Sequence, residues 1–191
     1  MKVAILALQG AFVEHQQMLE RLGVESVQIR KLDDWVRYRA SLAEGEKGAL
    51  IIPGGESTTQ LRLLRDLQLY APLREAIQDG MAVLGTCAGL IMLDAAHLGT
   101  MDIEVRRNAY GRQLGSFHTE GEMRGIGRVP MTFIRAPYIT QVGDGVEVLA
   151  MVDGHIVAAH QGQQLVTAFH PELDASTAIH QLFLSMAHLQ A

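Results

Sequence analysis

Short apolar runs alternate with helical patterns along the first half of the chain, and this alternation narrows the possible folds more than any other feature. The predicted strands are residues 2–8, 24–30, 48–52 and 81–84. The predicted helices cover residues 12–22, 35–42, a segment that ends at 67, and 71–78. Short continuous apolar strands separated by helices are typical of a parallel sheet that helices cover on both faces. The sequence therefore predicts a three-layer α/β fold.

Glycine and capping residues mark the ends of the predicted helices. Gly23 follows the first helix, where glycine is a common C-terminal signal. Small polar side chains precede three of the other predicted helices, as expected of N-cap residues. The predicted N-cap residues are Asp33 or Asp34 for the second helix, Ser57 or Thr58 for the third, and Asp174 or Ser176 for a final helix through Leu189.

The pattern changes between residues 102 and 169, where strand-like runs dominate. These runs are residues 103–105, 131–134, 146–152, 155–159 and 165–169. Asp153-Gly154 separates two of them and is a strong signal for a two-residue hairpin. We therefore expect an antiparallel extension on the mostly parallel core. No linker or repeat divides the sequence, so residues 1–191 are predicted to form one domain.

Composition excludes several classes of function. The chain of 191 residues is 48% hydrophobic, enough for a core, and its net charge of −5 provides no basic surface for nucleic acid. Its single cysteine excludes an internal disulfide and fits a reducing compartment. The apolar N-terminal run ends at Gln9-Gly10, is too short to span a membrane, and precedes no cleavage site. We expect a cytoplasmic protein without nucleic-acid or membrane partners.

The single cysteine, Cys87, lies in Gly85-Thr86-Cys87-Ala88-Gly89, directly after the fourth predicted strand. A glycine two residues on either side of a nucleophile, between strand and helix, is typical of a nucleophile elbow. The helix that follows favours the thiolate. The alternative is a small buried hydrophobic residue, which is the usual role of a lone cysteine.

A thiol nucleophile needs a base and a group that orients the base. His170 ends the last predicted strand, and Glu172 follows two residues later. An extended backbone would place both side chains on one face, so that the carboxylate could hold the imidazole tautomer. The alternative is a surface turn with a chance acid. The other histidines lie in unremarkable surroundings, and none shows the clustered spacing of metal ligands.

The turn Pro53-Gly54-Gly55 follows the third predicted strand. Backbone amides of glycine can approach a ligand closely, so the amides of Gly55 and Ala88 are predicted to form an oxyanion hole. The alternative for this segment is a loop that simply caps the next helix.

These motifs together resemble class I glutamine amidotransferases, whose glutaminase domains use a Cys-His-Glu triad. Within that class the chain resembles the glutaminase subunits of pyridoxal 5′-phosphate synthases. Six ordered segments carry the resemblance over essentially the whole chain: residues 8–11, 53–59, 85–91, 107–113, 133–137 and 169–173. Two departures are a short stretch at 94–101 and His118, where an acidic residue is common.

The resemblance implies hydrolysis of L-glutamine to glutamate and ammonia, without a metal or organic cofactor. The ammonia would pass to a separate synthase subunit, which joins it to a pentose phosphate and a triose phosphate to make pyridoxal 5′-phosphate. Docking of that subunit could rearrange the glycine turn, and segments 9–14 and 56–61 are candidate contacts. The implied catalytic residues are Cys87, His170 and Glu172, and the implied glutamine contacts are Gly55, Glu56, Ser57, Arg107, Ile134 and Arg135.

Three other functions remain possible from the sequence. A related amidotransferase subunit could feed histidine or aminodeoxychorismate synthesis. A cysteine hydrolase or chaperone with the same elbow often carries histidine directly after the cysteine, where this chain has Ala88. A binding domain without activity is the third alternative, although the intact triad argues against it.

Overall fold

A computed structural model describes residues 2–107 and 115–188, and its centre is a nine-stranded sheet. The strand order is β2-β1-β3-β4-β11-β10-β8-β5, and β9 pairs with β10. A separate two-stranded sheet is formed by β6 and β7. The strands are β1 (Val3–Leu6), β2 (Ser26–Ile29), β3 (Ala49–Ile52), β4 (Ala82–Thr86), β5 (Ile103–Arg106), β6 (Ser116–Met123), β7 (Gly127–Ile134), β8 (Tyr138–Val142), β9 (Glu147–Val152), β10 (His155–Gln161) and β11 (Gln164–Thr167).

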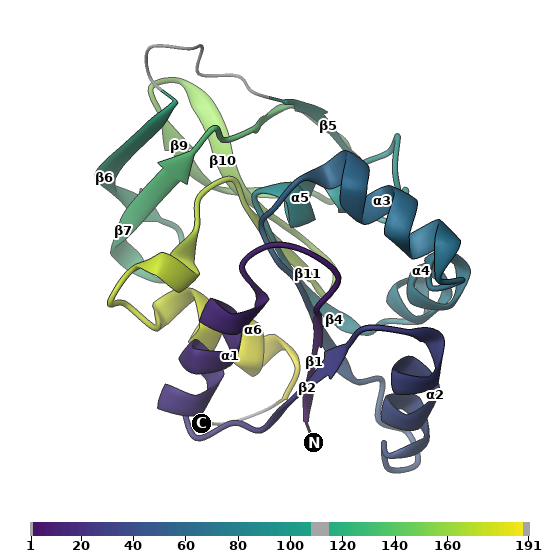
Figure 1. The fold of residues 1–191 in the computed structure, drawn as a ribbon. Helices are drawn as coiled ribbons and strands as arrows, with labels where there is room; N and C mark the ends of the chain where they lie inside the picture. Colours follow the sequence, from purple (N-terminus) through teal and green to yellow (C-terminus); the bar gives the residue numbers. More distant parts are fainter. Residues whose placement is uncertain (1, 108–114, 189–191) are drawn as a thin grey trace.

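Helices lie on both sides of the large sheet (Figure 1), with α1 and α6 on one side and α2, α3 and α4 on the other. The predicted three-layer α/β arrangement is therefore confirmed. Strands β1, β3, β4 and β11 are buried along their whole length, as expected of strands covered on both faces. The helices are α1 (Phe12–Arg21), α2 (Leu32–Ala40), α3 (Ser57–Asp66), α4 (Tyr70–Gln78), α5 (Ala88–Leu93) and α6 (Ala178–Met186), with a 3₁₀ turn, η1, at Pro171–Leu173.

The large sheet is parallel up to β11 and antiparallel beyond it, which confirms the predicted antiparallel extension on a mostly parallel core. Strands β2, β1, β3, β4 and β11 pair in parallel, whereas β11, β10, β8 and β5 pair antiparallel. The predicted hairpin joins β9 to β10, and Asp153 and Gly154 have φ angles of 50° and 77°. Positive φ at both central residues is the requirement of a type I′ turn.

Strands β6 and β8 were not predicted from the sequence. Strand β6 alternates exposed and half-buried residues until Met123, and Thr140 and Gln141 interrupt the apolar residues of β8, so neither forms a continuous apolar run. Strand β6 is held by its partner β7, against which Phe117 stacks on Phe133 with ring centroids 4.5 Å apart. Pairing with an apolar neighbour, rather than the strand's own pattern, decides its conformation.

The predicted N-cap residues are wrong for all three helices. Lys31 is the N-cap of α2, and Asp34 in the first turn accepts a hydrogen bond from the Lys31 backbone N–H. Glu56 is the N-cap of α3, because its longer side chain reaches the free amides of the first turn. Thr177 is the N-cap of α6, which ends at Met186, while Leu189 lies outside the described residues.

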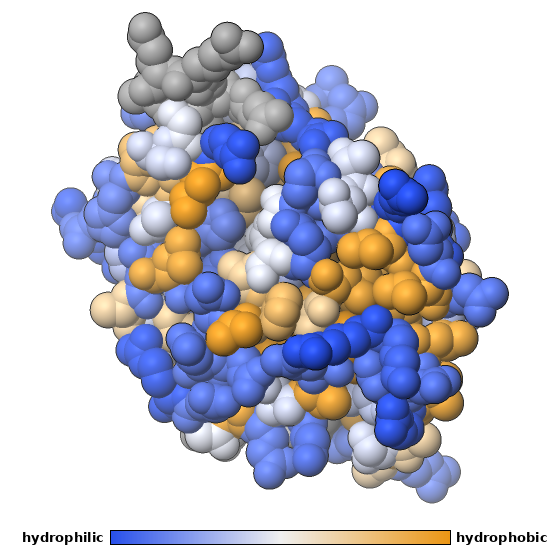
Figure 2. All heavy atoms as spheres, viewed as in Figure 1, coloured by the Kyte–Doolittle hydropathy of each residue, from blue (hydrophilic) through white to orange (hydrophobic). Residues whose placement is uncertain are grey.

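Figure 2 shows hydrophilic residues over most of one face, with smaller groups of apolar side chains among them. Within the described residues, no helix combines the length and apolar character needed to cross a membrane.

Candidate active site

Three neighbouring parallel strands end at one edge of the sheet and bring the predicted motifs together. Strand β3 leads into the glycine turn, β4 into Cys87, and β11 toward His170. Their registers align Ile52 with Gly85 and Thr86 with Thr167. Ligands of open α/β sheets bind at the carboxyl ends of the strands, where these motifs lie.

Cys87 has the strained backbone of a nucleophile elbow. Its φ angle of 49° lies in the left-handed region, and its backbone N–H donates to the Thr167 carbonyl over 2.8 Å. A Cβ on Gly85 would lie 2.7 Å from the Gly89 carbonyl oxygen, and a Cβ on Gly89 would lie 2.0 Å from that of Ile52. Both flanking glycines are therefore required by close contact with backbone, as the motif predicts.

His170 and Glu172 make the predicted contact by a different backbone route. His170 Nδ1 lies 2.7 Å from Glu172 Oε1. The expected extended backbone is wrong, because Pro171–Leu173 forms a 3₁₀ turn. The backbone N–H of His170 donates to the backbone carbonyl of Thr132 in β7 over 2.8 Å, which fixes the start of the turn. The turn, rather than a shared strand face, brings the two side chains together.

The buried surroundings shift the pKa of both groups. Burial acts to lower the pKa of His170, but its interactions with Cys87 and Glu172 outweigh burial and raise the pKa to about 10. Burial acts to raise the pKa of Glu172, but attraction to His15 and the hydrogen bond from His170 hold it below its ordinary value. The pair therefore favours an imidazolium beside a carboxylate at neutral pH.

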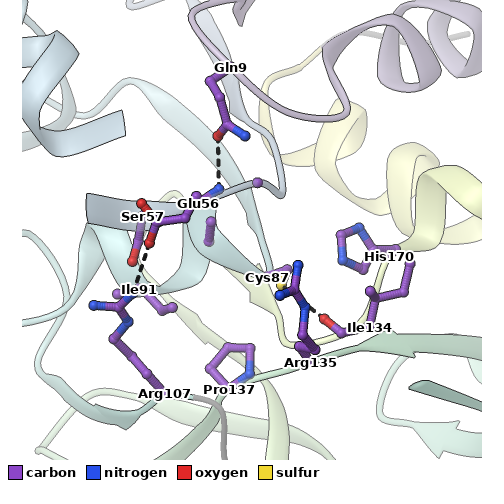
Figure 3. A pocket seen from close by; sticks show the side chains of 12 residues that line it. Gln9, Glu56, Ser57, Cys87, Ile91, Arg107, Ile134, Arg135, Pro137 and His170 are labelled. Atoms are coloured by element: carbon purple, nitrogen blue, oxygen red, sulfur yellow. Dashed lines mark hydrogen bonds and ion pairs between the residues drawn. The ribbon is translucent and has the colours of Figure 1, made fainter. Parts of the chain in front are cut away.

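A cavity of about 320 Å³ opens in front of these groups. Figure 3 shows side chains from several elements pointing into it. The lining residues are Gln9, Gly55, Glu56, Ser57, Cys87, Ala88, Ile91, Arg107, Ile134, Arg135, Pro137 and His170. Every residue predicted to bind substrate or to stabilise an oxyanion is among them, and Glu172 lies buried behind His170. Residues 108–113 of the predicted fourth motif lie outside the described residues.

The glycine turn is clamped by the segment that follows β1. The Gly54 carbonyl accepts from the Ala11 N–H over 3.0 Å, and a Cβ on Gly10 would lie only 1.8 Å from that carbonyl oxygen. A Cβ on Gly54 would lie 2.3 Å from His170 Cε1, and one on Gly55 would lie 2.4 Å from Gln9 Oε1. The turn therefore packs directly against the imidazole without room for a side chain.

Glu56 is engaged within the protein. Its carboxylate accepts from the Thr58 and Thr59 amides over 3.2 and 2.7 Å, and from Arg107 Nη2 over 2.9 Å. The hydrogen bond from the Thr59 amide contributes most to lowering the pKa of Glu56 to about 2. Arg107 also donates to the Thr58 hydroxyl over 3.1 Å. Two predicted substrate ligands thus form an ion pair at the cavity rim.

Arg135 lines the same cavity as Cys87. Its φ angle is 44°, and in the view of Figure 3 its guanidinium overlaps Cys87. Across residues 2–107 and 115–188 it makes no ion pair, so its charge faces the cavity uncompensated. The thiol of Cys87 contacts the neighbouring Ile134 carbonyl oxygen at 4.0 Å.

Sequence reasoning missed two buried histidines next to the site. The prediction that all other histidines have unremarkable surroundings is wrong for His15 and His180, which are fully buried. His15 Nε2 lies 3.5 Å from Glu172 Oε2 and 3.1 Å from Thr86 Oγ1. The available signal was a histidine among apolar residues on one helix face: His15 shares the buried face of α1 with Met18 and Leu19. In the described part of the chain, no group of His, Cys, Asp and Glu is arranged to hold a metal ion.

Comparison with known structures defines the class. A solved glutamine amidotransferase superposes with a TM-score of 0.88 at 40% identity, covering 99% of this chain and 100% of that one. The solved structure of PurLQS from Thermotoga maritima has a TM-score of 0.71 at 15% identity over 97% of this chain and 99% of the matched one, which is a likeness of fold alone. The architecture is therefore that of the class I glutamine amidotransferases.

Sequence comparison narrows the class further. The SNO glutamine amidotransferase family model matches residues 5–189. The chain is 55% identical over 193 aligned positions to pyridoxal 5′-phosphate synthase subunit PdxT of Streptococcus pneumoniae strains D39 and R6, covering 97% of each chain. The chain belongs to the SNO glutamine amidotransferase family, as the sequence resemblance predicts.

Proposed function

We propose that the chain is a glutaminase that hydrolyses L-glutamine to L-glutamate and ammonia. The observation that carries this proposal is that Cys87 and His170 line one cavity, with Glu172 buried behind His170 and its Oε1 2.7 Å from His170 Nδ1. Nucleophile, base and orienting carboxylate are the three parts of a covalent acyl-transfer site. Residues 1–191 act in this proposal as one glutaminase domain.

The chemistry proceeds through a covalent thioester. The Cys87 thiolate attacks the side-chain amide carbon of glutamine, and the amides of Gly55 and Ala88 stabilise the resulting oxyanion. His170 donates its proton to the leaving nitrogen, so that ammonia departs and a γ-glutamyl thioester remains. His170 then takes a proton from water, whose oxygen attacks the thioester and releases glutamate and the thiolate. Because the pKa of His170 is raised to about 10, its ring is protonated at neutral pH and can donate the proton for the first step.

The charged rim suits the α-amino and α-carboxylate groups of the substrate. The uncompensated guanidinium of Arg135 is the better partner for the α-carboxylate, since that of Arg107 is already paired with Glu56. Gly55, Ser57 and Ile134 line the same cavity and offer backbone groups to the rest of glutamine.

The partner in this proposal is a synthase subunit that uses ammonia to build pyridoxal 5′-phosphate from a pentose phosphate and a triose phosphate. The support is the 55% identity to subunits of that synthase in Streptococcus pneumoniae. Free ammonia is largely protonated near neutral pH, so a closed path between the two subunits would preserve its reactivity. The complex would work in the cytoplasm, and neither subunit needs an organic cofactor for the glutaminase step.

The deciding experiment measures glutamate release by this chain with and without a pyridoxal 5′-phosphate synthase subunit. Strong activation by the partner supports both the reaction and the pathway. Glutamine hydrolysis that is unchanged by the partner would support the reaction but contradict the assignment to pyridoxal 5′-phosphate synthesis. Inactivity of the folded protein in both assays would contradict the proposed glutaminase activity. The variant Cys87→Ala should abolish hydrolysis in the complex and preserve synthesis from added ammonium, and loss of both activities would contradict the division of labour.

A further inference from the structure

A pair of fully buried histidines lies directly behind the triad carboxylate. His15 belongs to α1 and His180 to α6, two helices on the same side of the sheet (Figure 1). His15 Nδ1 and His180 Nε2 are 2.9 Å apart, and neither residue is exposed to solvent. Two imidazoles in an apolar core are costly unless their nitrogens are used, because buried polar groups need partners.

The other nitrogen of His15 joins two parts of the active site. His15 Nε2 lies 3.5 Å from Glu172 Oε2 and 3.1 Å from Thr86 Oγ1. Thr86 Oγ1 in turn accepts the Gly54 N–H over 3.1 Å. One ring nitrogen therefore stands between the carboxylate that orients His170 and the turn that carries the predicted oxyanion donor.

The hydrogen-bond inventory selects one tautomer for each ring. Within the described residues, Glu172 Oε2 and His180 Nδ1 are buried and have no hydrogen-bond partner. If His15 carried its proton on Nδ1, His180 Nδ1 would be a buried N–H without an acceptor, and a lone pair of His15 would face the carboxylate. If both rings carry the proton on Nε2, His180 donates to His15, and His15 points a donor at Thr86 and Glu172. The groups then left without a partner are a neutral lone pair on His180 and the rotatable hydroxyl proton of Thr86, while the Glu172 carboxylate faces a donor instead of a lone pair, which is the cheaper arrangement.

We propose that His15, oriented by His180, is a positioning residue that holds both Glu172 and the Gly54 turn through its Nε2–H. It touches neither substrate nor thiol and acts through Glu172 and Thr86. This inference rests on the proposed function only where activity is the readout, since the tautomers are a property of the resting protein.

The charges around the pair are consistent with two neutral rings. Burial lowers the pKa of His15, against attraction by Glu172 and Glu14 and together with repulsion by His170. Burial lowers the pKa of His180 further, and His15 and Arg21 add to that shift. A neutral ring keeps one N–H and one lone pair, as the proposed chain of hydrogen bonds requires.

The first test is the tautomeric state of the intact protein, measured by long-range ¹H–¹⁵N correlation of the histidine rings. The expected result is a proton on Nε2 of both His15 and His180 at neutral pH. A proton on Nδ1 of His15, or a doubly protonated ring, would overturn the proposal. This measurement needs no substrate or partner, so its outcome is independent of the proposed function.

The second test separates positioning from stability. His15→Leu removes the donor, whereas His15→Gln keeps an amide N–H near the position of Nε2. We expect His15→Leu to lower kcat for glutamine about 10- to 100-fold with little change in KM, the range seen for outer-layer partners of other sites. We expect His15→Gln to recover most of that loss. The matched control is Leu73→Ala, a buried truncation in α4 that lowers stability away from the cavity.

Alkylation of Cys87 by iodoacetamide gives a readout without turnover. Weaker support for Glu172 should weaken the imidazolium beside the thiol, so the rate profile of His15→Leu should move to higher pH than that of the parent and of Leu73→Ala. An unchanged profile and unchanged kcat in folded His15→Leu, with an active parent, would overturn the positioning role alone. An inactive parent would instead reject the proposed function, while the tautomer and alkylation results would still decide the inference.

Discussion

The catalytic wall of the cavity and its recognition rim differ in their exposure to solvent and in the interactions that hold them. On the catalytic wall, the side chains of His170 and Glu172 are 8% and 0% exposed. On the recognition rim, those of Arg107 and Glu56 are 44% and 49% exposed. The catalytic wall is held by close backbone contacts and buried hydrogen bonds, whereas the rim is held by an ion pair in contact with water.

This difference in exposure determines how much the loss of an interaction should cost in each region. An unsatisfied group on the buried wall costs much, because no water replaces a lost partner. An exposed ion pair contributes little, since solvent screens it and its long side chains must be ordered. In the proposed mechanism the chemistry therefore depends on groups whose geometry is set by folding, and the exposed rim is the part that we expect to adjust when substrate or a partner protein binds.

The largest effect should follow from removing the charge of the triad acid. We expect Glu172→Gln to lower kcat about 10²- to 10⁴-fold with KM nearly unchanged, because the amide no longer stabilises the His170 imidazolium. Steady-state glutamine hydrolysis measures this, with Glu75→Gln on the surface of α4 as the same chemical change elsewhere. A loss below threefold would remove the distinction between the two walls.

The clamp on the glycine turn should have the next largest effect. Gly10 and Gly80 have nearly equal φ angles, 97° and 98°, but only a Cβ on Gly10 would overlap other atoms. Both alanine variants should lose stability through left-handed strain. Gly10→Ala should also lower kcat at least about 10-fold, because it displaces Gly54 from His170. Equal kcat values in the two variants would show that the turn tolerates displacement.

The rim arginines should affect substrate affinity rather than turnover. We expect Arg135→Asn to raise KM about 10- to 100-fold, since asparagine tolerates the left-handed backbone but removes the charge. Arg107→Asn should raise KM less, because Glu56 already neutralises this guanidinium. Glutamine titrations of both variants measure this, with Arg124→Asn as an exposed control outside the cavity. The opposite ranking would assign the α-carboxylate to Arg107.

The smallest effect should come from the exposed helix cap. Glu56 has a pKa lowered from 4.5 to about 2 in the folded protein, so its carboxylate stabilises the fold above pH 4.5. That contribution is lost as the pH falls from 4.5 toward 2. We expect Glu56→Gln to lower the free energy of unfolding by about 0.5–1 kcal/mol at pH 7. Urea unfolding should show this gap narrowing below pH 4.5, and a constant gap from pH 7 to pH 3 would contradict the role of the charge.

Local patterns predicted those parts of the site whose members are close along the chain. Cys87 lies two residues from a glycine on each side, and Glu172 follows His170 by two residues. Their chemical roles could therefore be predicted from the sequence without knowledge of the fold. The predicted geometry of that second pair was nevertheless wrong, because a 3₁₀ turn makes the contact. The cap at Glu56 was missed for a similar reason: the reach of a side chain, and not only its type, decides which group meets a free amide.

The sequence by itself determined the strand and helix alternation, the elbow and the family, because each rests on neighbouring residues or on ordered motifs. Only the tertiary structure decided that β3, β4 and β11 stand side by side, which brings the glycine turn, Cys87 and His170 to one cavity. It also decided that His15 meets His180, 165 positions away, behind Glu172. Contacts of this kind depend on strand order and helix packing across the sheet, and no local pattern encodes them.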